Sequence, residues 1–152
     1  MKETFQNMLR HMAWADRRIG AALAAAEDAP AEAVKWYAHI VGAETIWLSR
    51  IEGGDSYPVP VFPAWDVATS REASEETLTN YARLLETCDD YSRVVVYRLS
   101  TGAEARTSVS DILTHVFLHG SYHRGQINAK LRVAGLEPTP VDYILYAREN
   151  LG

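Results

Sequence analysis

Apolar side chains recur at steps of three and four residues along most of the chain, the spacing that places them on one face of an α-helix. This pattern predicts a first helix over about residues 2–27 and, after a break at Asp28-Ala29-Pro30, a second helix over about 30–51. Further long helices are predicted over about 71–91 and 108–134. The sequence therefore predicts an all-α protein built on four long helices.

Two segments interrupt the helical pattern. Three prolines within 57–63 exclude a helix there, so this segment is predicted to be a long crossover between the second and third helices. β-Branched and aromatic residues over 93–99 are followed by a turn at Ser100-Thr101-Gly102 and a short return over 103–107. This arrangement predicts a small β-hairpin before the fourth helix.

The ends of the last long helix carry recognisable signals. Ser108 is a predicted N-cap with Asp111 reaching back to it, and Gly135 is the expected left-handed residue after the helix. A short helix over about 142–150 is predicted to close the chain. Residues 1–152 are therefore expected to form a single domain, a four-helix bundle with one hairpin.

Composition and charge exclude several classes of protein. The formal net charge is −5, and no cluster of lysine or arginine suggests binding along a nucleic-acid backbone. No apolar run reaches the roughly 20 residues that a membrane-spanning helix needs. The single cysteine, Cys88, cannot form an internal disulfide, so we expect a cytoplasmic protein that binds neither nucleic acid nor membrane.

Three histidines, His115, His119 and His123, follow one another at four-residue steps on the fourth helix. The outer two are separated by roughly 12 Å along the axis, whereas a zinc–nitrogen bond is about 2 Å, so only a neighbouring pair can share one ion. A helical projection favours His119 and His123 and leaves His115 on the flank. It predicts an inward stripe of Ile112, Val116, His119, His123, Ile127 and Ala134. Two inward imidazoles are costly without a common partner, which favours a metal site over two hydrogen-bonded core histidines.

Several motifs resemble a known family. On the fourth helix they are Ile112-Leu113-Thr114-His115, His119, Tyr122-His123-Arg124-Gly125-Gln126-Ile127, Leu131-Arg132 and Gly135. Upstream they are Met12-Ala13-Trp14-Ala15-Asp16, in which aspartate replaces the family's asparagine, and His39-Ile40 with Glu44, Trp47, Leu48 and Arg50. Together with the hairpin over 94–110 and the closing Asp142-Tyr143 segment, these motifs resemble the DinB family of damage-inducible bacterial proteins over nearly the whole chain.

The resemblance implies an up-down-down-up four-helix bundle that is often a homodimer. It also implies a metal held by His39, His119 and His123. The helical projection alone supports His39 less well, because His39 lies at the edge of the stripe of apolar residues on its helix. His11, on the first helix, is the alternative histidine and is expected to be exposed or to cap a helix.

Partners for the imidazoles are expected close by, because metal-bound histidines are usually oriented through their second ring nitrogen. Asp16, Glu44 and Gln126 are the candidates. Arg124 is expected to be a cation at the surface or at an interface, and Trp65, which follows the proline-rich crossover, is expected to line the mouth of the metal pocket.

Three imidazoles with open positions are typical of a catalytic metal site, and nickel, zinc, iron or manganese would suit such a site. DinB-like proteins include thiol transferases that use bacillithiol or mycothiol and a mycothiol-dependent isomerase. The resemblance therefore implies a metal that activates a low-molecular-weight thiol towards a small-molecule substrate. Two alternatives remain open at this point, a metal-binding stress-response protein without catalysis and a hydrolase that uses metal-bound water.

Overall fold

The computed structural model describes residues 1–54 and 57–150. The elements within these residues are the helices α1 (Lys2–Ala25), α2 (Ala31–Ile51), α3 (Val67–Thr87), α4 (Val109–Val133) and α5 (Tyr143–Asn150), and the strands β1 (Val94–Arg98) and β2 (Glu104–Ser108). The predicted order of four long helices, a hairpin and a short last helix is confirmed. The third helix begins earlier than expected, at Val67 instead of Arg71, because the side chain of Asp66 accepts a hydrogen bond from the amide of Thr69 at 2.8 Å.

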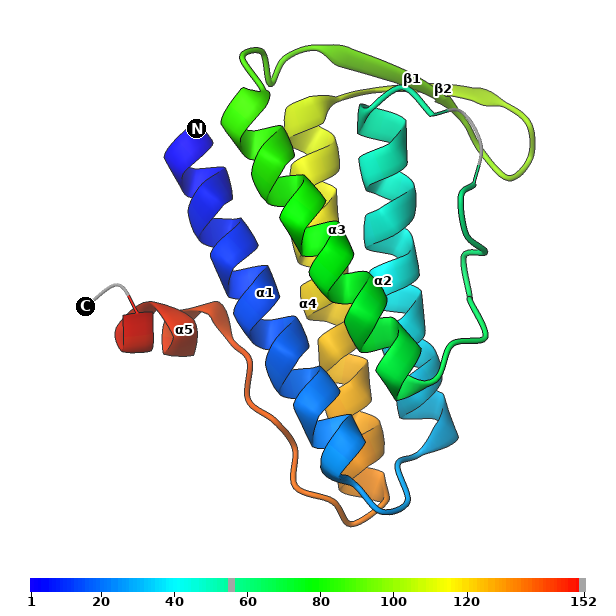
Figure 1. Cartoon of the computed structure of the whole chain (residues 1–152), viewed down its shortest axis with the longest axis vertical. Helices are drawn as coiled ribbons and strands as arrows, with labels where there is room; N and C mark the ends of the chain where they lie inside the picture. The colour runs from blue at the N-terminus through cyan, green and yellow to red at the C-terminus, as the bar shows by residue number, and fades with distance from the viewer. Residues whose placement is uncertain (55–56, 151–152) are drawn as a thin grey trace.

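The four long helices lie side by side in a bundle (Figure 1). Helices α1 and α4 run in one direction and α2 and α3 in the other, the arrangement that the sequence resemblance implies. The connection that leads into α3 follows the length of the bundle instead of turning tightly, which allows α2 and α3 to be parallel. Among the residues described, no helix combines the length and apolar character needed to cross a membrane.

The hairpin covers one end of the bundle (Figure 1). Its antiparallel register pairs Val95 with Thr107 and Tyr97 with Ala105, and the side chains of Val95 and Tyr97 are buried in the core. The predicted N-cap at Ser108 is confirmed, since its hydroxyl accepts from the amide of Asp111 at 3.1 Å. Gly135 has the expected left-handed conformation, with φ of 74°.

The buried core has two apolar parts. One lies towards the hairpin and the other towards the opposite end, and the second includes Ile19, Ile40 and Ile127. Between them along the helices lie buried polar residues from all four long helices. They are Asp16 on α1, Glu44 on α2, Ser74 and Thr77 on α3, and His123 and Arg124 on α4. This polar layer contains His123, and His39 lies about one turn before Glu44 on α2.

Candidate metal centre

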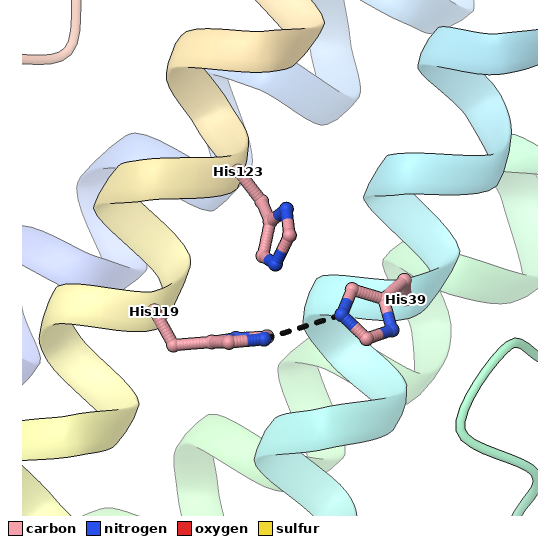
Figure 2. Close-up of side chains that lie close together, drawn as sticks. All are labelled: His39, His119 and His123. Carbon is pink, nitrogen blue, oxygen red and sulfur yellow. Dashed lines mark hydrogen bonds between the residues drawn. The ribbon is translucent and has the colours of Figure 1, made fainter.

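The structure brings His39 of α2 together with His119 and His123 of α4. Figure 2 shows the three rings converging in the space between these two helices. One ring nitrogen of each histidine lies within 4.8 Å of the corresponding atoms of the other two, a grouping that could hold a metal ion. The Nε2 atoms of His39 and His119 are 3.2 Å apart. His39, which the helical projection placed at the edge of its stripe, is 6% exposed and belongs to the cluster.

The second nitrogen of two rings is held from outside the cluster. His39 Nδ1 lies 2.7 Å from the carbonyl oxygen of Val61, in the crossover. Since a carbonyl only accepts, His39 carries its proton on Nδ1 and directs the lone pair of Nε2 into the cluster. His123 Nδ1 lies 2.5 Å from Gln126 Oε1, so the same tautomer follows for His123. Gln126 therefore lies at hydrogen-bonding distance from one imidazole of the cluster.

These tautomers leave a bare Nε2 lone pair on His39 and on His123, and either a proton on His119 Nε2 or a shared cation can satisfy it. Two nitrogens bound to one tetrahedral ion at 2.0–2.1 Å would be roughly 3.3 Å apart, close to the separation between His39 and His119. Burial, with the neighbouring imidazoles adding to it, lowers the pKa of His119 to about 3, and burial also lowers the pKa of His39. Neutral imidazole nitrogens without a carboxylate among them suit a transition metal better than calcium or magnesium.

Two aromatic rings that the sequence did not point to as part of the site lie flat against its histidines. Trp36, one turn before His39 on α2, stacks on His123 with ring centroids 4.6 Å apart and planes inclined by 17°. Phe62 of the crossover stacks on His39 at 4.3 Å and 14°. The helical position of Trp36 is equally typical of a core residue. The prolines of the crossover indicate an extended segment, but nothing in the sequence indicates which residue reaches the histidines.

His115 lies outside the cluster, as the projection predicts. Its ring is exposed, and its centroid is 5.4 Å from that of His119 and 5.1 Å from Trp47. The projected stripe is otherwise buried except at two positions: His119 is half-buried and Ala134 is exposed, because α4 ends at Val133. The helix also buries Arg124 at 1% exposure.

Several residues lie elsewhere than expected. Asp16 and Glu44 are fully buried, but no hydrogen bond joins either carboxyl to the histidine cluster within the described part of the chain; Asp16 pairs with Arg124 instead. Arg124 is therefore a core residue, not the surface cation that its charge suggests. His11 is buried at 4% exposure, and its Nε2 lies 2.8 Å from the carbonyl oxygen of Val141, so the expectation of an exposed or capping residue was wrong.

The ring of Trp65 packs against the apolar cluster at the far end of the bundle from the hairpin. Trp36, which stacks on His123, packs against the same cluster, and the position of Trp65 at the pocket mouth stays a prediction. Phe62, three residues earlier, is the crossover residue that contacts the histidines.

Comparison with known proteins agrees with the motifs. The sequence matches the model of the DinB family over residues 1–150. A segment of 41 residues is 56% identical to Protein DinB of Bacillus subtilis (strain 168), and it covers 27% of this chain and 24% of that protein. The match to this curated relative thus spans about a quarter of its length, whereas the family model covers nearly the whole chain.

Proposed function

The chain belongs to the DinB family, and from this premise we propose that it binds one divalent transition metal through His39, His119 and His123. The observation that carries the proposal is the convergence of three imidazoles whose outer nitrogens, in two cases, are held by protein acceptors. Such outer contacts are characteristic of metal-bound histidines because they fix the tautomer and raise the basicity of the ligand.

We further propose that the site activates a low-molecular-weight thiol for transfer or isomerisation. A bound dication with three neutral ligands lowers the pKa of a thiol or water that takes a further position. The exposed surroundings suit a small molecule, since Phe62 is 48% exposed and Tyr122, whose ring packs against His123, is 67% exposed. The chain's residues then have distinct tasks: the imidazoles would hold the metal, while Val61, Gln126, Trp36 and Phe62 keep the rings in place.

The test begins with metal content. Protein purified without a histidine tag should contain close to one equivalent of metal per chain. Cobalt(II) substitution should give a ligand-field spectrum, and a small thiol added near neutral pH should produce a sulfur-to-cobalt charge-transfer band. A cobalt spectrum that no thiol perturbs would contradict the thiol chemistry and leave a metal-binding protein without it. Absence of metal binding would contradict the whole proposal.

The homodimer and the cytoplasmic location expected from the sequence remain predictions. Light scattering of the purified protein measures the first directly, and its result is independent of the metal site.

A further inference from the structure

Three ionisable side chains meet in the core near the histidine cluster. Arg124 of α4 is 1% exposed, Asp16 of α1 is 0% exposed, and Nη1 of the arginine lies 2.6 Å from Oδ1 of the aspartate. Glu44 of α2 is 1% exposed, and its carboxyl neighbours that of Asp16, so that each carboxyl influences the pKa of the other. We call these three residues the core triad. Asp16 and Glu44 are the carboxyl side chains that the described structure buries.

The charges of the core triad do not balance if both acids are ionised, because two carboxylates would face one guanidinium. As two carboxylates, they would also lack donors: Asp16 Oδ2 and both carboxyl oxygens of Glu44 have no hydrogen-bond partner among the residues described. A proton on Glu44 supplies the missing donor, since its O–H can donate to the Asp16 carboxylate.

Tyr37, Tyr81, His11 and Glu75 do not supply the core triad with charge or hydrogen bonds, whereas Nε and Nη2 of Arg124 and the hydroxyls of Ser70 and Ser74 are buried without a partner among the residues described. The hydroxyls of Tyr37 and Tyr81 donate to the backbone carbonyls of Asp16 and Glu44, so they do not serve the carboxyl groups. His11, the other titratable group near Asp16 on α1, has its pKa lowered by burial and is neutral near pH 7. On the α3 side, Glu75 is paired with Arg17 at the surface. Burial raises the pKa of Asp16 and, further, that of Glu44.

We propose that Glu44 is protonated and shares its proton with Asp16, and that the resulting neutral core triad positions α4 so that His119 and His123 face His39. The second part rests on the metal binding proposed above. Arg124 directly follows His123 in the sequence, and its ion pair with Asp16 ties this turn of α4 to α1. Breaking such a pair is costly because it leaves a buried charge without a partner.

Gly120 makes room for this arrangement. A Cβ atom at Gly120 would lie 2.9 Å from Nη1 and 3.1 Å from Nη2 of Arg124, so the guanidinium folds over the glycine one turn before it. A methyl group there would displace the guanidinium, which is the end of a flexible side chain, and leave the helix intact. Gly125 on the same helix faces open space, because no neighbouring group lies within 4 Å of the position that its Cβ would take. Gly125→Ala therefore supplies a matched control.

The protonation is tested in metal-free protein by infrared spectroscopy at pH 7. The wild type should show the carbonyl stretch of a protonated carboxylic acid, and Glu44→Gln should lose it while remaining folded, because glutamine keeps a neutral donor towards Asp16. Absence of an acid band in the wild type would overturn this part of the proposal. So would a band that persists unchanged in Glu44→Gln.

The positioning is tested by cobalt(II) titration of folded variants. Two variants disturb the guanidinium: Gly120→Ala displaces it, and Arg124→Lys keeps the charge but loses the planar set of N–H donors. Each should weaken cobalt binding about tenfold or more and alter the ligand-field spectrum at saturation. Gly125→Ala should match the wild type. Wild-type affinity and spectrum in both Gly120→Ala and Arg124→Lys, with unchanged helical circular dichroism, would overturn the positioning role. Failure of the wild type to bind cobalt would instead contradict the proposed function and leave the infrared result standing.

Discussion

Phe62 lies flat on His39, with ring centroids 4.3 Å apart and planes inclined by 14°. The carbonyl oxygen of Val61, the preceding residue, accepts the hydrogen bond of His39 Nδ1. Two consecutive residues of the crossover therefore hold one imidazole, one through its face and the other through its edge. The long connection between α2 and α3 has a specific role in the candidate metal centre beyond joining the two helices.

This contact predicts that Phe62→Ala weakens metal binding without unfolding the protein. The phenylalanine is 48% exposed, so little core packing is lost, whereas His39 loses the ring that limits its rotation. We expect the apparent Kd for zinc or cobalt(II) to rise about threefold to tenfold, in line with the 0.5–1.5 kcal/mol that an aromatic pair is worth. Isothermal titration measures the change.

Val61→Ala is the matched control for Phe62→Ala. Its side chain is 40% exposed, and its contribution to His39 comes from the backbone carbonyl, which the substitution keeps. Metal affinity should stay at the wild-type value. Equal losses of metal affinity in the two variants would mean that the backbone conformation of the crossover, and not the Phe62 ring, holds His39 in place.

The histidines themselves give the sharpest prediction. Each of the three imidazoles is a proposed ligand, so removing one leaves only two. Alanine at His119 or His123 should abolish stoichiometric metal binding, and His39→Ala should weaken it strongly. His115→Ala should spare binding, since the ring of His115 is exposed and lies outside the cluster. Elemental analysis of each purified variant measures the outcome. Loss of metal in His115→Ala together with retention in His123→Ala would show that the wrong pair was chosen.

Removal of the metal should lower the stability of the protein without unfolding it. Binding only to the folded state adds about 2.7 kcal/mol at a hundredfold excess of metal over Kd, which for a domain of this size corresponds to about 5–10 °C in Tm. The bundle should keep its helical circular dichroism at 25 °C with chelator present, because apolar clusters lie on both sides of the polar layer. Complete loss of helical signal would indicate a structural metal site instead.

The sequence was sufficient for the helices, the hairpin and the pair on α4, because periodicity and capping are local. The position of His39 required the family resemblance, since a single histidine on one helix does not reveal which helix it faces. Arg124 shows the other limit. Charge alone suggested the surface, but Asp16, 108 residues earlier, supplies a buried counter-charge. Which charged residues meet in a core depends on how helices pack, and no local pattern encodes this.

The last prediction concerns pH and His11, which lies outside the metal centre. Burial lowers the pKa of His11 below its ordinary 6.5; the nearby Val141 carbonyl opposes this shift, and Arg124 adds to it. Below pH 6.5 the unfolded chain therefore binds a proton at this residue that the folded chain does not. The free energy of unfolding should fall as the pH drops below 6.5, by up to about 1.4 kcal/mol per pH unit for this group, until the pH reaches the folded-state pKa.

His11→Gln should remove this contribution, because glutamine can still donate to the carbonyl of Val141 but does not titrate. Denaturant unfolding in the presence of a chelator, at pH 7.0 and at two or three values below 6.5, measures the slope for the wild type and the variant. His115→Gln should also reduce the slope, because burial lowers the pKa of His115 as well. If the slopes of the wild type and His11→Gln coincide, His11 takes up a proton as readily in the folded protein as in the unfolded chain. The interface between α1 and the segment before α5 would then have to admit water to this ring.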